Sequence, residues 1–310
     1  MKHADINTVY FVVLHYGPIE RTIRCVDSLL TQEKVSGVHC CIVIVENGYS
    51  PARDDGLSHK YSECEGVVLI KSVENLGFSG GNNLGYDYIE RQSVDGCVGT
   101  IAVFLNNDTE ISDPAFMAKL VAEYETTHFD VLSPDVFDPS VQQHQSPLCK
   151  GSDIDTYARG EALKARALVD EQTLARIYHA LKNRVVACFG VTAIGRRLIR
   201  LRRIGTTPST DWEQPLEDVV PQGSAVIFGP SYLDKSTVAF EPQTFMYFEE
   251  CILKIKCESL GLSIRYLPTL QVLHHHNEIT LESLFANTYE KRRKQARLTV
   301  EAYRGYLDYL

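Results

Sequence analysis

Short apolar runs alternate with helix-like stretches in the first third of the sequence, and this alternation strongly constrains the fold. Four strand-like runs occupy Val9–Leu14, Cys41–Val45, Val67–Ile70 and Ile101–Leu105. Apolar residues recur at helical spacing within Ile19–Leu30, and a second helix is predicted over Asn82–Arg91. Strands that alternate with helices form parallel sheets joined by right-handed crossovers. We therefore expect an α/β fold with a doubly wound, mostly parallel sheet and flanking helices.

The second half of the chain is less regular. Residues 139–155 are rich in Pro, Gly, Ser and Gln and are expected to form a loop, and residues 157–183 are helix-like and charged. Strands are expected at residues 225–228, 262–267 and 270–273, and helices at residues 249–260 and from near Leu281. The sequence contains no internal repeat or low-complexity linker. The simplest organisation is one domain with an elaborated C-terminal half.

Charge and composition exclude several classes of protein. The chain has 40 acidic residues against 31 Lys and Arg, a formal net charge of −9, which argues against a nucleic-acid-binding protein with a broad basic face. No apolar run approaches the roughly 20 residues of a membrane-spanning helix, and the N-terminus lacks signal-peptide features. The nine cysteines include no C-x-x-C pair, which argues against a disulfide framework or zinc ribbon. We expect a cytoplasmic protein.

Oxygen-bearing side chains follow the fourth strand-like run at Asn106, Asn107 and Asp108. Such oxygens suit Mg²⁺ or Mn²⁺, and a carboxylate at a strand end can hold such an ion against a diphosphate. An Asn/Asp turn with self-capping side chains accounts for the same residues. Upstream, Asn75–Gly85 is a glycine-rich turn opening a helix, suited either to close approach of an anion or to a structural turn.

Two further clusters carry candidate chemistry in the second half. Glu249 and Glu250 follow an aromatic run, where a carboxylate could act as a general base or could simply stabilise a helix N-terminus. Three histidines, His274 to His276, follow a strand-like run, and strand alternation places His275 on the opposite face from the other two. These histidines are candidates for metal ligands or for ordinary packed and solvated side chains.

Taken in order, these segments resemble the family 2 glycosyltransferases, especially the bacterial rhamnosyltransferase-like branch, from Val9 to near Thr280. The matching segments are His15–Gly17, Val45–Asn47, Asn75–Gly85, Leu105–Asp108, Gln222–Ser224, Phe248–Glu250 and Pro268–His274. The resemblance implies a GT-A fold whose nucleotide-sugar-binding half spans residues 1–112 and whose acceptor-binding and catalytic half spans residues 113–280, followed by a helical extension over residues 281–310. It also implies inverting, metal-dependent sugar transfer from a dTDP- or UDP-sugar, for example dTDP-rhamnose. The acceptor would be a glycan or lipid-linked molecule in surface polysaccharide synthesis.

The resemblance also assigns site residues. Asp108 and His274 would bind Mg²⁺ or Mn²⁺, and Glu250 would be the catalytic base, with Glu249 as the rival. Ile252 stands where a second acid is common in the family, and Glu250 replaces the usual aspartate. Donor-binding residues would be His15, Tyr16, Glu46, Asn47, Asn75, Gly77, Phe78, Gly81, Asn82, Asn106 and Asn107.

Two other functions and one localisation stay open. A non-catalytic sugar- or nucleotide-binding protein could share the fold, and so could a sugar nucleotidyltransferase. The basic segments Arg196–Arg203 and Lys291–Lys294 are either solvated helix faces or contacts to anionic lipid headgroups. In the second case the protein would lie peripherally at the inner face of the membrane.

Overall fold

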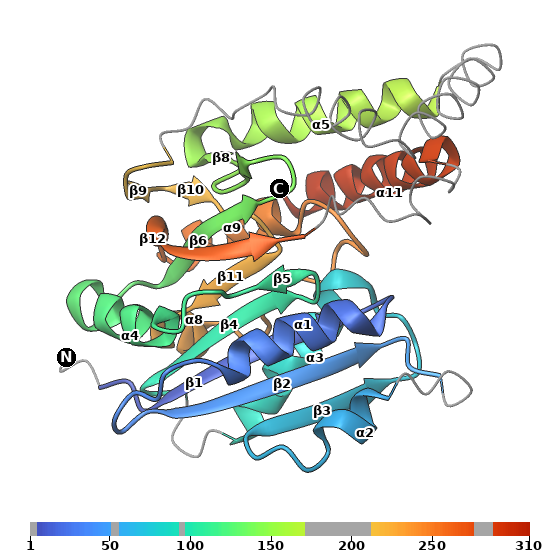
Figure 1. Ribbon diagram of the computed structural model, residues 1–310. Helices are drawn as coiled ribbons and strands as arrows, with labels where there is room; N and C mark the ends of the chain where they lie inside the picture. The colour runs from blue at the N-terminus through green and yellow to red at the C-terminus, as the bar shows by residue number, and fades with distance from the viewer. Residues whose placement is uncertain (1–4, 51–55, 93–96, 171–211, 276–287) are drawn as a thin grey trace.

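The computed structural model describes residues 5–50, 56–92, 97–170, 212–275 and 288–310. Within these residues, the main sheet has ten strands, eight of them in the order β3-β2-β1-β4-β11-β6-β12-β5 (Figure 1). These eight strands are β1 (Thr8–His15), β2 (His39–Asn47), β3 (Val67–Ser72), β4 (Thr100–Asn106), β5 (Thr109–Glu110), β6 (Val131–Asp138), β11 (Ala225–Phe228) and β12 (Ile264–His274).

The first four strands form a parallel unit at one side of the sheet. β1 lies between β2 and β4 and is parallel to both, and β2 is in turn parallel to β3. From Val9 to His15 every residue of β1 is buried, which is the pattern of a strand covered by helices on both faces. The expected doubly wound, parallel arrangement is confirmed for this half.

The sheet continues through strands of mixed direction. β11 is antiparallel to both β4 and β6, whereas β12 is parallel to β6 and antiparallel to β5. Two short strands, β7 (Gln143–His144) and β9 (Leu216–Glu217), pair with β6 and β12. A separate antiparallel pair joins β8 (Cys149–Lys150) to β10 (Val219–Val220).

Helices pack on both faces of the sheet and enclose two apolar cores. α1 (Ile19–Leu30), α2 (Leu57–Tyr61) and α4 (Phe116–Thr127) cover one face. On the other face lie α3 (Gly77–Gln92), α8 (Pro230–Lys235) and α9 (Glu249–Ser259). Figure 1 shows the result as a layered α/β structure.

A third apolar cluster lies beyond this layered body. α5 (Ile154–Val169) and α11 (Thr288–Tyr309) run side by side in Figure 1 and pack on each other. Ala158 and Ala162 of α5 meet Ala302 and Tyr306 of α11, and Phe248 at the start of α9 joins the same cluster. The C-terminal helix is therefore packed against the segment that opens α9.

Several predicted elements match the structure and others differ. The predicted bounds of α1 and β11 are confirmed, whereas α3 begins five residues before Asn82 and includes most of the glycine-rich turn. The two strands predicted at residues 262–267 and 270–273 form one strand, β12, whose register with β6 shifts between Leu267 and Gln271. The predicted loop at residues 139–155 holds β7, β8 and a 3-10 turn over Gly151–Asp153.

The sequence pattern does not predict α4 or β6. Pro134 lies within β6, and a proline without a backbone N–H is unusual in a central strand. β11 pairs with β6 at Val131 and Leu132, before this proline, so Pro134 does not interrupt the hydrogen bonds between β6 and β11. The predicted helix beyond residue 170 and the basic segment at residues 196–203 lie outside the described residues, as does the expected start of the last helix. No helix in the described ranges is long and apolar enough to cross a bilayer.

Candidate active site

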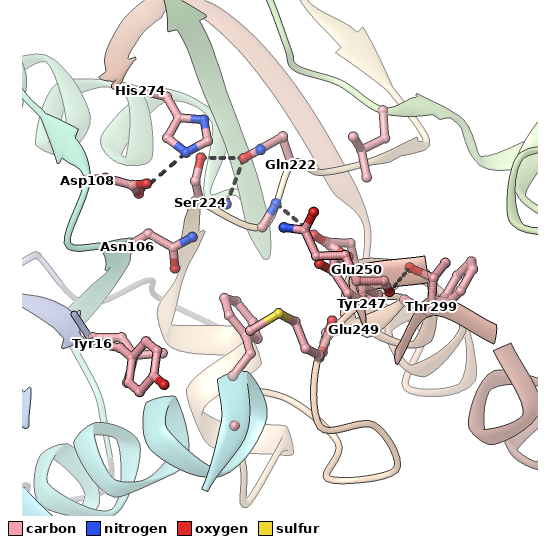
Figure 2. Close-up of a pocket in the computed structure, with 18 of the residues that line it drawn as sticks. Tyr16, Asn106, Asp108, Gln222, Ser224, Tyr247, Glu249, Glu250, His274 and Thr299 are labelled. Atoms are coloured by element: carbon pink, nitrogen blue, oxygen red, sulfur yellow. Dashed lines mark hydrogen bonds and ion pairs between the residues drawn. The ribbon is translucent and has the colours of Figure 1, made fainter. Parts of the chain in front are cut away.

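A cleft of about 590 Å³ opens at the carboxyl ends of β1, β2 and β4. Parallel strands bring polar residues that follow them to one edge of the sheet, where ligands of α/β proteins bind. The opposite wall comes from the turn before α9 and from α5 and α11. Figure 2 shows Asp108 and His274 on one side of the cleft and Glu249 and Glu250 on the other.

Asp108 and His274 form a pair across the junction of β5 and β12. His274 Nε2 lies 3.4 Å from Asp108 Oδ1 (Figure 2). Two main-chain features hold the pair, because His274 is in register with Thr109 and the His275 N–H donates to the Asp108 carbonyl oxygen at 2.8 Å. The pairing of β5 with β12 therefore brings together two residues that are far apart in the sequence.

The orientation of the His274 ring suits a metal ligand. Its Nδ1 lies 2.6 Å from Gln145 Oε1. An amide oxygen can only accept, so Nδ1 carries a hydrogen, and Nε2 is the ring nitrogen that faces Asp108. A second hydrogen bond of this kind is what fixes histidine ligands in metal sites. The donor set of one carboxylate and one imidazole therefore fits a divalent cation, although no cluster of three or more His, Cys, Asp or Glu donors occurs in the described part of the chain.

Arg21 is a lining residue that the sequence pattern does not reveal. It lies on α1, and its Nη1 is 3.7 Å from Asp108 Oδ2. The Arg21 side chain is about one-third exposed, so it can also reach an anion in the cleft. Nothing in the local sequence around Arg21 distinguishes it from other basic residues on a helix.

A network of asparagines builds the turn between β3 and α3. Asn47 Nδ2 donates to Asn75 Oδ1 at 3.1 Å and to the Gly77 carbonyl oxygen at 2.9 Å, and Asn47 Oδ1 accepts from the Leu76 N–H at 2.8 Å. Asn75 Oδ1 also accepts from the Gly77 N–H at 3.0 Å. These bonds attach the glycine-rich turn to the end of β2.

Gly77 is required at its position for two reasons. Its φ of +74° is left-handed, and an added Cβ would lie inside contact distance of the Phe245 carbonyl oxygen. The neighbouring Phe78 N–H donates to that same oxygen at 2.9 Å. The glycine-rich turn thus packs directly on the segment that leads to Glu249 and Glu250.

Most of the predicted donor residues line the cleft. Tyr16 is 61% exposed at its edge, and Asn106 faces the cleft near Asp108 (Figure 2). Asn107 also lines it, but its Nδ2 donates to the Tyr16 carbonyl oxygen and to Thr22 Oγ1, so it braces the wall. The predicted residues in the lining are Tyr16, Asn47, Asn75, Gly77, Phe78, Asn106, Asn107, Asp108, Glu249, Glu250 and His274.

Four predicted donor residues lie behind the cleft wall. His15 is buried with its Nδ1 2.6 Å from Thr22 Oγ1, and Glu46 is buried with Lys71 Nζ at 3.8 Å. Gly81 packs against Asn47 and Leu14, and Asn82 donates to the Phe78 carbonyl oxygen at 3.1 Å. Alternate residues at a strand end face opposite sides, which separates His15 from Tyr16 and Glu46 from Asn47. Direct donor contact by these four stays a prediction.

Glu250 is held at the cleft by a backbone contact. Its Oε1 accepts a hydrogen bond from the Gly223 N–H at 3.1 Å, and a Cβ at Gly223 would overlap this oxygen. Glu249 is more deeply placed and only 3% exposed, whereas Glu250 is partly exposed towards the cleft. The glycine after Gln222 therefore allows the Glu250 carboxylate to approach the backbone.

Burial separates the two glutamates chemically. Removal from water, together with the neighbouring Glu250 charge, raises the pKa of Glu249 to about 8. Burial also raises the pKa of Glu250, while hydrogen bonds from backbone amides, including that of Gly223, oppose this rise. Two adjacent carboxyls cannot easily both be ionised. At neutral pH the proton belongs on Glu249, and Glu250 is the carboxylate able to accept one.

The far wall contains residues that sequence reasoning missed. They come from α5, from α11 and from the loops beside them, and none lies in a recognisable motif, whereas the segment Gln222–Ser224, which matches the family resemblance, lines the cleft as well. Gln222 Oε1 accepts hydrogen bonds from both the backbone N–H and the hydroxyl of Ser224, which shapes the centre of the cleft (Figure 2). The additional lining residues on this wall include Leu148, Tyr157, Glu161, Gln295 and Thr299.

Comparison with known proteins gives structural rather than sequence similarity. No family profile and no curated protein matches the sequence. The structure of GalNAc-T7 with UDP, GalNAc and Mn²⁺ is similar at 12% identity and a TM-score of 0.50, over 87% of this chain and 44% of that one. The structure of S. aureus TarS 1–349 is similar at 10% identity and a TM-score of 0.50, over 97% of this chain and 72% of that one.

The chain therefore spans less than half the length of the GalNAc-T7 chain that it resembles. At these identities the similarity concerns the fold, and both similar structures are GT-A-type glycosyltransferases. The mixed sheet, the flanking helices and these structural neighbours lead to the conclusion that the chain adopts the GT-A fold.

Proposed function

We propose that the protein is an inverting, metal-dependent glycosyltransferase that uses a nucleoside-diphosphate sugar. The observation that carries the proposal is the composition of one cleft. The Asp108–His274 pair lines one end of it, and Glu250, an acid with a raised pKa, lines the other. An inverting displacement needs a leaving-group site and a base on opposite sides of the reacting carbon, and this cleft offers a candidate for each.

In the proposed reaction, Glu250 acts as the general base and the nucleoside diphosphate is the leaving group. The Glu250 carboxylate takes the proton from an acceptor hydroxyl, and that oxygen forms a bond to the anomeric carbon. The bond between this carbon and the diphosphate oxygen breaks, and the electron pair leaves with the nucleoside diphosphate. Glu249, which burial keeps protonated, leaves Glu250 as the acceptor of that proton. General-base assistance of this kind contributes about 10²–10⁴-fold in rate.

Asp108 and His274 would hold the cation, with Asn106 beside them. When bound, Mg²⁺ or Mn²⁺ supplies charge stabilisation to the departing diphosphate. Arg21 can add a positive charge at the same end of the cleft, because its guanidinium reaches the Asp108 carboxylate. The asparagine network from Asn47 to Gly77 shapes the adjoining surface for the rest of the donor.

The finer parts of the proposal concern the substrates and the cellular site. We propose a UDP- or dTDP-sugar, with dTDP-rhamnose as one candidate, and membership of the family 2 rhamnosyltransferase-like branch. The acceptor would be a glycan or lipid-linked molecule of surface polysaccharide synthesis. The reaction would take place in the cytoplasm or at the inner face of the membrane. The motif order supports this branch, and the UDP and Mn²⁺ named with GalNAc-T7 are compatible with the donor class and cation.

Division of the chain at residues 112 and 280 is also part of the proposal. The donor half would end after β5, and the catalytic half would end after β12. The last segment takes part in the site, because Gln295 and Thr299 of α11 line the cleft.

Donor hydrolysis tests the proposal without knowledge of the acceptor. UDP-glucose, UDP-GlcNAc and dTDP-rhamnose are incubated with the protein and Mn²⁺, and release of the nucleoside diphosphate is measured with and without EDTA. We expect metal-dependent release of UDP or dTDP that Glu250→Gln abolishes. A parallel thermal-shift series with UDP, dTDP and GDP should raise the melting temperature only when Mn²⁺ is present. Absence of both release and stabilisation would overturn the proposal.

A further inference from the structure

The turn that precedes the two glutamates has an unusual backbone. Tyr247 and Phe248 have φ values of +81° and +66°, in the left-handed region that residues other than glycine rarely occupy. Phe248 is the residue directly before α9, so this conformation sets the direction in which Glu249 and Glu250 leave the turn. Two consecutive residues in this region persist only where surrounding contacts hold them.

The aromatic contacts of Phe248 come from the C-terminal helix. The Phe248 ring is 5% exposed, and its centroid lies 5.6 Å from that of Tyr303 and 5.9 Å from that of Tyr306. The two tyrosine rings are themselves 5.9 Å apart and stacked. Aromatic rings at these separations attract one another beyond the burial of their area. α11 therefore covers the strained turn with an aromatic surface.

Three further contacts hold α11 in place beside the turn. The Tyr306 hydroxyl donates to Asp155 Oδ1 on α5 at 2.9 Å, which sets the position of the ring. Gly305 lies so close to the segment that precedes the turn that an added Cβ would be 2.7 Å from the Gln243 carbonyl oxygen. At the other end of the helix pair, Arg293 Nη2 donates to the Val169 carbonyl oxygen at 2.9 Å. The helix is thus anchored to α5 at two places and packs closely against the segment that leads to the turn.

We propose that Tyr303 and Tyr306 are positioning residues that act through Phe248 to aim the Glu250 carboxylate into the cleft. The inference rests on the proposed role of Glu250 as the base. None of the three aromatic residues has to touch the substrate for this role. Their task is to keep the left-handed turn in place, so that Glu250 stays within reach of both the Gly223 N–H and an acceptor hydroxyl.

The test compares turnover with nucleotide binding in aromatic variants. The variants are Phe248→Ala, Tyr306→Ala, Tyr306→Phe and the double variant Phe248→Ala with Tyr306→Ala. Each is assayed for hydrolysis of whichever of UDP-glucose, UDP-GlcNAc or dTDP-rhamnose the wild type cleaves fastest with Mn²⁺. The Kd of the corresponding nucleoside diphosphate with Mn²⁺ is measured separately. All rates are expressed per folded molecule, with the folded fraction taken from circular dichroism.

We expect the alanine variants to lose about tenfold or more in kcat, because small displacements of a catalytic group are costly. The nucleotide Kd should stay within about twofold of wild type, since the donor end is built by other segments. Tyr306→Phe keeps the ring and should retain most of the activity. The double variant should be no slower than Phe248→Ala, because both substitutions remove one positioning effect.

The pH profile provides a readout that a merely structural role would not change. Burial raises the pKa of Glu250, so a turn that opens to water should bring this pKa down towards that of an ordinary glutamate. The acidic limb of kcat should therefore move to lower pH in Phe248→Ala. Tyr61→Ala is the matched control, because Tyr61 is a fully buried aromatic residue of α2 outside the cleft. Its kcat per folded molecule and its pH profile should match the wild type.

The outcomes separate this inference from the proposed function. If Glu250→Gln is inactive but Tyr306→Ala keeps a kcat within about twofold of wild type, the positioning role is wrong and the proposed function stands. Loss of nucleotide affinity in parallel with kcat would also overturn it, since α11 would then support the whole fold. If the wild type cleaves no donor, or if Glu250→Gln stays active, the proposed function fails and this inference fails with it.

Discussion

The two walls of the cleft are built in different ways. On the donor side, Asn47 and Asn106 are the last residues of β2 and β4, and Asp108 follows β4 by two residues. On the base side, the wall combines α5, the turn before α9 and α11, which are separated by long stretches of sequence. The donor wall is encoded by strand ends, whereas the base wall exists only after distant helices pack.

This difference predicts how each wall responds to substitution. A residue at the end of a buried parallel strand is held by the main-chain ladder, so changing its side chain alters chemistry more than position. A residue in a turn held by side-chain packing can be displaced from a distance, through the residues that pack on it. The four experiments below test this comparison.

Glu250→Gln is expected to have the largest effect. The amide keeps the shape of the side chain but cannot accept the acceptor's proton, so kcat should fall by about 10²–10⁴-fold. Nucleotide affinity should stay close to that of the wild type, because the substitution is confined to the base wall. Glu249→Gln is assayed in parallel and should lose much less activity, since burial already keeps Glu249 protonated. A larger loss in Glu249→Gln would reverse the assignment of the base.

Asp108→Asn should come next and should affect a different quantity. Loss of the carboxylate weakens the cation site, so the Mn²⁺-dependent Kd for UDP or dTDP should rise together with a fall in kcat of about 100-fold. Isothermal titration with and without Mn²⁺ measures the first effect. Asp113→Asn is the control, because Asp113 pairs with Lys119 at the surface. If Asp108→Asn binds nucleotide and Mn²⁺ as the wild type does, the metal assignment is wrong.

Gly77→Ala tests the contact between the two walls. The added methyl group combines a left-handed φ with an overlap at the Phe245 carbonyl oxygen. Gly37→Ala is a matched control, since Gly37 has a φ of +78° and no atom within 4 Å of an added Cβ. We expect Gly37→Ala to cost about 1 kcal/mol of unfolding free energy and Gly77→Ala to cost at least twice that. Equal costs in urea denaturation would indicate that the loop yields without disturbing residue 245.

Glu249→Gln should have the smallest effect on turnover, and its main signature should be a change in the pH dependence of stability. The pKa of Glu249 is raised in the folded state, so the folded protein binds the proton more tightly than the unfolded chain does. Its contribution is fully present below the unfolded pKa and is lost as the pH rises towards about 8. Between the unfolded-state pKa of Glu249 and about pH 8, this group should lower the unfolding free energy of the wild type by up to about 1.4 kcal/mol per pH unit. Melting curves of Glu249→Gln should lose less stability between pH 6 and pH 8, and parallel curves for the two proteins would contradict the assignment.

Much of the donor half was predictable because its signals are local. The helical spacing in Ile19–Leu30 predicts the observed bounds of α1, and in the other half the apolar run at Ala225–Phe228 does the same for β11. The asparagine and aspartate residues after β4 were also placed at the correct edge of the sheet, since strand direction fixes where a strand ends. Their roles in donor and metal binding stay predictions.

The rest depends on tertiary contacts that no local pattern records. His15 and Glu46 sit at strand ends, but side-chain alternation turns them away from the cleft, which a motif match does not reveal. β6 is not predicted because it contains Pro134, which argues against a central strand. Whether a proline interrupts a strand ladder depends on which neighbouring strand pairs with that residue, and the sequence does not show this. Gln295 and Thr299 reach the cleft only because α11 packs beside α5, and nothing around them in the sequence marks a site.

The position of β11 in the sheet has a consequence for how the molecule folds. β11 lies between β4 and β6, so in this part of the sheet it bridges strands that precede it by about a hundred residues. The other link between the two sides, β5 with β12, is equally non-local. Closing such long loops is slow because chain entropy is lost before contacts compensate for it. We expect β1 to β4 to condense early, and the Asp108–His274 pair to form among the last events of folding.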